Sequence, residues 1–196
     1  ALTLLSACGN SAGAGKTAEE TKTEGTSAVA GEAATEKEGA KTENTADDSK
    51  FAVSDDSLTF TAKNLDKEDI DSSIFADKDL TVLNVWGTFC GPCINEMPEL
   101  AAWAKEMPEN VQIVGLVADI SGDTDEQHID LAKKIMEQSS GEFTNIIPGV
   151  DFVPLLSNVV GVPTTYFINK EGKIVGRPIV GAQVPKYKAF VEEYLK

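Results

Sequence analysis

A Cys-Gly-Pro-Cys tetrapeptide, Cys90 to Cys93, stands at the junction of two stretches with different hydrophobic periodicity. Before it, residues 80–86 form a nearly continuous apolar run, which predicts a central strand buried on both faces of a sheet. After it, apolar residues recur every three or four positions and predict an amphipathic helix: Ile94, Met97, Leu100, Ala101 and Ala104. The sequence therefore places both cysteines at the start of a helix that follows a buried strand.

The start of a helix favours thiol chemistry at Cys90. Unpaired amide N–H groups and the positive end of the helix dipole stabilise a thiolate there, so the pKa of the first cysteine falls below the free value of about 8.5. Pro92 suits a first helical turn because it has no N–H to leave unpaired, and with Gly91 it brings Cys93 one turn along. We expect Cys90 to be the nucleophile of thiol–disulfide exchange and Cys93 the more buried, resolving thiol.

Other uses of a cysteine pair fit the sequence less well. A zinc site needs four ligands, but the chain has one further cysteine, Cys8, and one histidine, His128. Haem attachment requires a histidine directly after the second cysteine, where Ile94 stands. A structural disulfide that closes so short a loop removes little entropy from the unfolded chain. We therefore expect no metal and no bound cofactor, the redox centre being the Cys90–Cys93 disulfide itself.

The rest of the apolar pattern predicts an α/β domain. Strand–helix–strand alternation implies parallel strands joined by right-handed crossovers. The last helix should turn a core face inward through Val184, Tyr187, Phe190, Val191 and Tyr194. Strands are expected at residues 111–118, 143–147 and near 174–180, helices at 123–138, 151–159 and 184–195, and a hairpin or pair of edge strands at 58–61 and 70–74.

Two blocks of the sequence resemble the extracytoplasmic thioredoxin-like reductases of the TlpA/ResA type. The first runs from Asn84 through Cys93 to Pro98, and the second covers residues 161–169 and 172–175. The resemblance spans residues 51–196 and implies a thioredoxin-like fold, in which helices flank a central mixed sheet, with that family's N-terminal extension and central insertion.

The resemblance also carries expectations for the second block. It implies a cis peptide between Val162 and Pro163 that packs against Cys90, so Pro163 belongs to the active site. A cis turn there would expose the backbone of Val162 to pair with an extended client segment.

The chain departs from related patterns at two positions. Asn84 stands where cytosolic thioredoxins carry a buried aspartate that accepts the proton of the second cysteine, and an amide cannot titrate. Some relatives place glutamate between the cysteines, where this chain has Gly91. The nearest remaining carboxylate, Glu96, either assists deprotonation of Cys93 or only caps and solvates the helix. Trp86 is expected to pack in the core and to line the rim of the active site.

The first fifty residues differ in composition from the rest. Residues 1–8 are a short apolar run ending in Leu-Ser-Ala-Cys, which resembles the bacterial lipobox and predicts lipidation at Cys8. Residues 9–50 have no aromatic side chain and only Val29 as a large aliphatic one, too little apolar surface to offset the entropy of ordering. We expect a residual signal peptide at 1–8, a disordered tether at 9–50 and one folded domain at 51–196.

The formal net charge is −15, with 17 Lys and Arg against 32 Asp and Glu. Such a chain repels polyanions, so nucleic acid is not an expected partner. We expect a monomer, and no stretch approaches the roughly 20 consecutive apolar residues of a spanning helix.

The leading hypothesis is a lipid-anchored disulfide reductase on the outer face of a bacterial cytoplasmic membrane, acting on oxidised extracytoplasmic proteins. The Gly-Pro pair between the cysteines matches reducing thioredoxins, near about −270 mV, rather than the oxidant DsbA, near about −120 mV. The resemblance implies a CcdA-type membrane thiol transporter as electron donor.

One alternative is a thiol peroxidase, although Thr88 lies two residues before Cys90 and not three, which is the spacing those enzymes use. Another is a dithiol copper module, for which His128 is the only histidine.

Overall fold

The computed structural model describes residues 50–196. The lipidation predicted at Cys8, the signal peptide at 1–8 and the tether up to residue 49 lie outside the described residues. No helix among residues 50–196 combines the length and apolar character needed to cross a bilayer. The elements, in chain order, are β1 (Val53–Ser57), β2 (Thr61–Asn64), β3 (Asp69–Asp71), the 3₁₀ helix η1 (Ser72–Phe75), β4 (Leu80–Trp86), α1 (Gly91–Glu106), β5 (Val111–Val117), α2 (Glu126–Gln138), β6 (Asn145–Ile147), the 3₁₀ helix η2 (Val150–Phe152), α3 (Val153–Leu156), β7 (Thr164–Asn169), β8 (Lys173–Val175), β9 (Ile179–Val180) and α4 (Val184–Tyr194).

The strands of residues 50–196 form one mixed sheet in the order β1-β8-β7-β4-β5-β6-β2-β3, with β9 also paired to β7. Strand β4 lies near the centre, parallel to β5 and antiparallel to β7. At one level of the sheet, Asn84 of β4 stands beside Gly115 of β5 and Thr165 of β7. The predicted α/β class with a central mixed sheet is confirmed.

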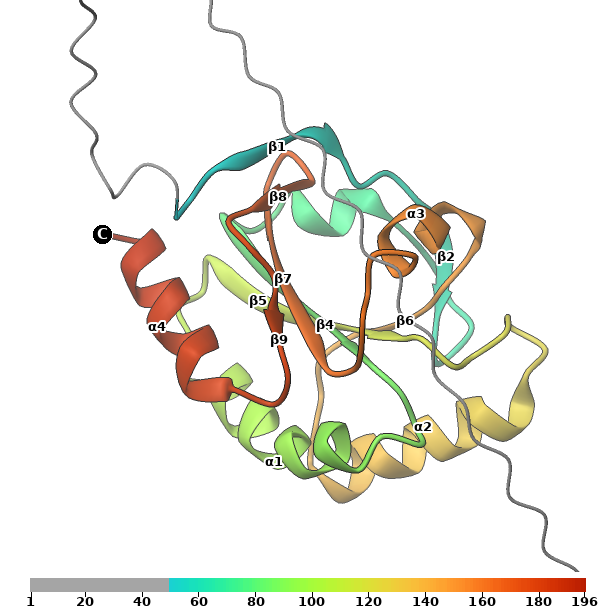
Figure 1. Ribbon diagram of the computed structural model, residues 1–196. Helices are drawn as coiled ribbons and strands as arrows, with labels where there is room; N and C mark the ends of the chain where they lie inside the picture. The colour runs from blue at the N-terminus through green and yellow to red at the C-terminus, as the bar shows by residue number, and fades with distance from the viewer. Residues whose placement is uncertain (1–49) are drawn as a thin grey trace, which may run out of the picture. The chain divides into compact units, whose positions relative to one another are not determined.

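The two faces of the sheet are covered by different helices, as Figure 1 shows. Alternate residues of β4 point to opposite sides, and all seven are buried. Leu80, Val82 and Trp86 pack in the core beneath α1, α2 and α4. Leu83 and Val85 pack in a second core with side chains from η1, η2 and α3. This two-sided burial explains why the sequence of β4 is a continuous apolar run with no strict alternation.

The strand predicted near residues 174–180 is instead two short strands, β8 and β9. Gly176, between them, has φ = +68°, a left-handed conformation that ends β8, and Pro178 has no amide N–H to donate to a ladder. Strand β8 pairs with β1 and β7, whereas β9 pairs with β7. The prediction was right about the position and wrong about continuity.

The N-terminal hairpin exists but is shifted from its predicted residues. Strands β2 and β3 pair antiparallel with Thr61 opposite Asp71. Residues 72–74, predicted as strand, belong to η1, because the Asp71 carboxylate accepts the N–H of Ser73 and caps a helical turn. Strand β1 was not predicted, since its exposed residues show no alternation, and it pairs with β8 at the sheet edge.

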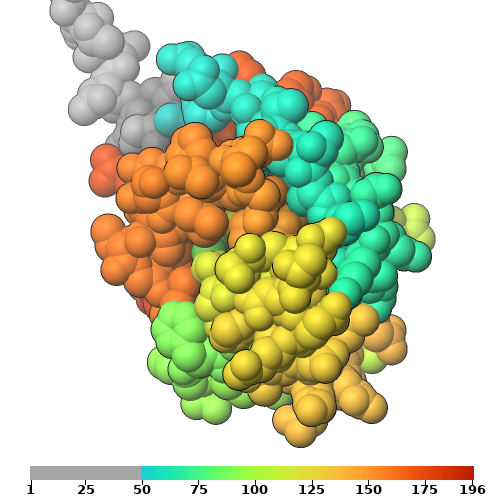
Figure 2. All heavy atoms as spheres, turned by 90° about the vertical axis from the view of Figure 1, so that its right-hand side faces the viewer, coloured from blue at the N-terminus to red at the C-terminus, as the bar shows by residue number. Residues whose placement is uncertain are grey.

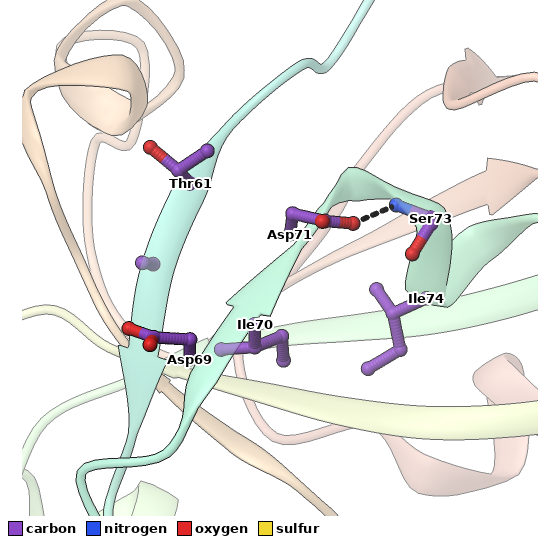
Figure 3. Close-up of a pocket in the computed structure, with 7 residues that line it drawn as sticks. Thr61, Asp69, Ile70, Asp71, Ser73 and Ile74 are labelled. Atoms are coloured by element: carbon purple, nitrogen blue, oxygen red, sulfur yellow. Dashed lines mark hydrogen bonds between the residues drawn. The ribbon is translucent and has the colours of Figure 1, made fainter.

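Segments far apart in the sequence meet on the face shown in Figure 2, where the N-terminal strands, the loop after β5 and the segment before β7 lie side by side. The Thr61 N–H donates to Asp151 Oδ2 at 3.2 Å across this face. A hollow of about 450 Å³ lies at the β2–β3 edge, where the Asp71 carboxylate points to Ser73 (Figure 3). Strands β5, β6 and β2 separate that edge from β4, so the hollow is not part of the cysteine site.

Gly115 gives a test of how β5 packs. A Cβ atom there would overlap Asn145 Oδ1, which accepts the Trp86 Nε1–H at 2.8 Å. We expect Gly115→Ala to lower the free energy of unfolding by about 1–3 kcal/mol, because neighbouring side chains must move. Asn145→Ala should cost about 1–3 kcal/mol by leaving a buried indole N–H unpaired.

Urea denaturation of the single and double variants measures both effects. Since Asn145→Ala also removes the overlap, the double variant should be less destabilised than the sum of the two single variants. If the two losses of unfolding free energy add exactly, the overlap with Asn145 is not what excludes a side chain at position 115.

Candidate active site

The two cysteines lie where the sequence predicts them, between β4 and α1. Their Sγ atoms are joined in a disulfide, with the Cα atoms 5.2 Å apart. Cys90 is the N-cap residue of α1, and its Sγ accepts the N–H of Cys93 at 3.2 Å. Cys90 is 6% exposed and Cys93 is fully buried, so the predicted difference in burial is confirmed. Amide N–H groups of the first helical turn therefore face the sulfur that we expect to carry the thiolate.

The loop before β7 packs against Cys90. The peptide between Val162 and Pro163 is cis, as the family resemblance implied. The Val162 carbonyl oxygen lies 3.4 Å from Cys90 Sγ. Gly91 and Pro92 are exposed on the other side of the disulfide, and a Cβ atom at Gly91 would meet no neighbour. The site is therefore exposed at Gly91 and Pro92, whereas the backbone of Val162 packs against Cys90.

A buried polar cluster lies between α1, the sheet and α4. The Asn84 Nδ2 group donates to Glu96 Oε1 at 3.0 Å and to Thr165 Oγ1 at 3.1 Å. The Tyr187 hydroxyl group of α4 donates to Glu96 Oε2 at 3.3 Å. All four side chains are buried, although Glu96 belongs to a residue type that is rarely buried unless paired. Among residues 50–196, Asn84 Oδ1 has no hydrogen-bond partner, so the cluster has one unused acceptor.

Burial raises the pKa of Glu96 to about 7. Hydrogen bonds from Asn84 and Tyr187 favour the charged form and oppose this effect, and the nearby charge of Glu99 adds to it. Glu96 is three residues after Cys93 and therefore lies one turn along the same helix. A carboxyl group that is about half ionised at neutral pH can either accept or donate a proton.

The exposure of two aromatic residues near the cysteines differs from the prediction. Trp86 was expected to line the rim of the active site, and this is wrong: it is fully buried, and its indole N–H donates to Asn145. The β-strand period turns Trp86 toward the core beneath the helices. Phe89, directly before Cys90, is 74% exposed and takes the outer position.

Sequence reasoning missed Asp119, which fixes the loop before Cys90. The Thr88 N–H donates to both carboxylate oxygens of Asp119, at 3.0 and 3.1 Å, and the Thr88 hydroxyl group donates to Oδ2. Asp119 lies two residues after Val117, the carboxyl end of β5, which is the parallel neighbour of β4. A signal was available, because the carboxyl ends of adjacent parallel strands meet at the same edge of a sheet.

Comparison with known proteins agrees with this geometry. The profile of the AhpC/TSA family matches residues 53–177. The thiol-disulfide oxidoreductase ResA of Bacillus thuringiensis subsp. konkukian is 30% identical over 149 residues, which cover 75% of this chain and 79% of the relative. ResA of Oceanobacillus iheyensis is 31% identical over 140 residues, 67% of each chain.

Solved structures share the fold. A secreted Mycobacterium tuberculosis disulfide oxidoreductase homologous to Escherichia coli DsbE is 25% identical, with a TM-score of 0.54, over 71% of this chain and 99% of that one. The pneumococcal exposed lipoprotein thioredoxin Etrx1 is 19% identical, with a TM-score of 0.56, over 68% of this chain and 98% of that one. The likeness to Etrx1 supports the fold alone.

The raised pKa of Glu96 predicts a pH-dependent stability. In the unfolded chain the carboxyl group ionises near its ordinary pKa of 4.5, and in the folded protein near 7. The folded state therefore holds more protons between these values, and its stability is full below pH 4.5 and falls as pH rises through 7. Between pH 5 and 8, the oxidised protein should lose up to about 3 kcal/mol of unfolding free energy relative to Glu96→Gln.

Urea denaturation of both proteins across this pH range tests the prediction. Glu106→Gln is the matched control, because it removes the same charge from an exposed position at the end of α1. Parallel pH profiles for the wild type and Glu96→Gln would contradict the raised pKa.

Proposed function

The chain belongs to the AhpC/TSA family and is a thiol–disulfide oxidoreductase of the ResA type, and from this premise we propose that it reduces disulfides of extracytoplasmic proteins while tethered to a membrane. The observation that carries the proposal is the Cys90–Cys93 pair at the start of α1, next to the Val162 carbonyl group. Reducing work requires Cys90 to be available as a thiolate, and the helix start supplies the amide groups that stabilise one.

The proposed reaction has two exchange steps. The Cys90 thiolate attacks one sulfur of a client disulfide, forms an S–S bond to it, and releases the other client sulfur as a thiolate that takes up a proton. The Cys93 thiolate then attacks Cys90 Sγ, breaks the mixed disulfide and releases the second client thiolate. Two electrons pass from the cysteine pair to the client, and the protein ends with the Cys90–Cys93 disulfide.

Glu96 is our proposed proton acceptor for Cys93 in the second step. The resolving thiol is fully buried and must lose its proton to attack. Asn84 cannot accept that proton, whereas Glu96 lies one turn farther along α1 with a pKa near neutral pH. This supports catalysis over simple capping, because a buried carboxyl group is a costly way to cap or solvate a helix.

We propose that clients bind as extended segments beside Pro163, along the backbone of Val162. The exposed ring of Phe89, the residue before Cys90, offers an apolar contact for such a segment.

The direction and place of the reaction are also proposals. The Gly-Pro pair between the cysteines supports a reducing potential, and a CcdA-type membrane thiol transporter is the proposed electron donor. Lipidation at Cys8 would hold a monomeric protein at the outer face of a bacterial cytoplasmic membrane. Among the structural relatives, the Mycobacterium tuberculosis oxidoreductase is described as secreted, which supports a location outside the cytoplasm.

A thiol peroxidase is the main alternative, since the matched family profile does not by itself separate peroxide from disulfide substrates. Here the Thr88 hydroxyl group already donates to Asp119, so it is not free to bind a peroxide oxygen beside Cys90. For the copper alternative, residues 50–196 contain no group of three or more His, Cys, Asp or Glu side chains that could hold a metal ion.

Trapping tests the assignment of the nucleophile. In Cys93→Ala the resolving thiol is missing, so mixed disulfides on Cys90 should persist at least roughly tenfold longer than in the wild type. Non-reducing electrophoresis followed by mass spectrometry identifies what is attached. Cys90→Ala is the control and should trap nothing; if it traps clients and Cys93→Ala does not, the roles of the two cysteines are reversed.

The reduction potential tests the direction of electron flow. We expect the Cys90–Cys93 couple to equilibrate with glutathione or dithiothreitol buffers at about −270 mV, as reducing thioredoxins do. A value above about −150 mV would instead identify an oxidant. A parallel assay with hydrogen peroxide should give no turnover, and rapid turnover would favour the peroxidase.

A further inference from the structure

The hydroxyl group of Tyr187 lies among several polar neighbours inside the domain, including Thr165 of β7, whose hydrogen bond lowers the pKa of Tyr187. Its oxygen is 2.7 Å from the Gly181 carbonyl oxygen and 3.3 Å from Glu96 Oε2, and it accepts the Gln183 N–H at 3.1 Å. The side chain is fully buried, and burial raises the pKa of Tyr187, so the hydroxyl group keeps its proton at neutral pH. The geometry therefore offers one phenol proton to two acceptors.

One proton cannot serve both acceptors at once. When Glu96 is neutral, the phenol donates to the nearer Gly181 carbonyl group, and Glu96 can donate its own proton to the phenol oxygen. When Glu96 is ionised, its charge makes it the stronger acceptor and draws the phenol proton away from Gly181. The hydroxyl group of Tyr187 thus has two bonding states, selected by the charge of Glu96.

Gly181 connects this choice to the loop beside the cysteines. Its N–H donates to the Pro163 carbonyl oxygen at 2.7 Å, continuing the ladder in which Val180 of β9 pairs with Thr164 of β7. Its φ is +88°, which glycine adopts readily and a residue with a side chain rarely does, so the turn requires a glycine at this position. Helices α1 and α4, which carry Glu96 and Tyr187, lie on the same face of the sheet (Figure 1).

We propose that Tyr187 is a positioning residue that couples the charge of Glu96 to the cis-proline loop through Gly181. With Glu96 neutral, both the N–H and the carbonyl group of Gly181 are hydrogen-bonded, and these two bonds restrain the loop at Pro163. With Glu96 ionised, the carbonyl bond is lost and the loop loosens. The coupling regulates client binding only if clients bind beside Pro163, so this inference rests on the proposed function.

Few other groups hydrogen-bond Glu96 or shift its pKa. Asn84 on β4 donates to it, and Thr165 on β7 bonds the same amide. Glu99 on α1 raises the pKa of Glu96, and Glu99 itself pairs with Lys188 Nζ of α4 at 3.2 Å. Cys93 titrates only in the reduced protein, so the oxidised protein removes it from the titration. His128 on α2 also titrates in this range, with its pKa raised by the hydrogen bond to Asp125, and Glu96→Gln separates its effect from that of Glu96.

Amide NMR of the oxidised full chain tests the coupling without any client. Between pH 5 and 9, the Gly181 and Gln183 N–H resonances of the wild type should titrate together with a midpoint near 7, the pKa of Glu96. Hydrogen exchange at Gly181, corrected for the intrinsic effect of pH, should become about 3- to 10-fold faster as Glu96 ionises, as expected for losing one hydrogen bond. Both changes should disappear in Tyr187→Phe and in Glu96→Gln.

Tyr166→Phe is the matched control, because Tyr166 is also buried and no hydrogen bond of its hydroxyl group occurs within residues 50–196. It should keep the wild-type titration at Gly181. A titration that persists in Tyr187→Phe or in Glu96→Gln overturns the proposal, as does its absence from the wild type.

Activity separates this inference from the proposed function. With reduced protein, Tyr187→Phe should raise KM for insulin disulfides about 3- to 10-fold and leave KM for the small disulfide 5,5′-dithiobis(2-nitrobenzoic acid), which needs no loop contacts, within about twofold. Loss of the hydrogen bond to Glu96 changes kcat for both substrates alike. If the wild type reduces neither substrate, the proposed function fails. If it reduces both and Tyr187→Phe changes both KM values equally, the coupling fails and the function stands.

Discussion

Burial of β4 on both faces is the constraint on which the site depends. Because this strand is covered on each side, a slip by one position would move Asn84 away from its hydrogen-bond partners and into the apolar core on the opposite face. The fixed register turns Asn84 toward the helices that also cover Trp86. It also ends the strand just before the loop that carries Cys90, so α1 begins with its first amide groups facing the sulfur atoms.

The same burial makes the polar cluster costly and therefore informative. Asn84, Glu96 and Thr165 lie in a layer otherwise filled by apolar side chains, and moving such groups out of water opposes folding. Partial compensation comes from the hydrogen bonds among them and from Tyr187. The cluster connects the helix that carries the cysteines to the loop that contains Pro163, so the proposed proton transfer and the proposed client contacts belong to one network.

How far the sequence predicts the site depends on the distance over which each contact is made. Cys90, Pro92 and Cys93 act within one strand–turn–helix unit, so local periodicity places them. Trp86 lies on the same side of β4 as the cysteines, but its indole is buried against Asn145 of β6, a contact between distant segments that the apolar run does not record. The segment at 174–180 was misjudged because Gly176 interrupts it through its backbone conformation, which apolar periodicity does not record.

By itself, the sequence determined the α/β class, the cysteine pair at a helix start and the deeper burial of Cys93. These follow from periodicity and from the chemistry of neighbouring residues. Only the tertiary structure decided that Glu96 is buried against Asn84, that Asp119 holds Thr88, and that Tyr187 reaches both Glu96 and Gly181. Each of those contacts joins side chains from different elements, and their distances are set by how the helices pack on the sheet, which no local pattern encodes.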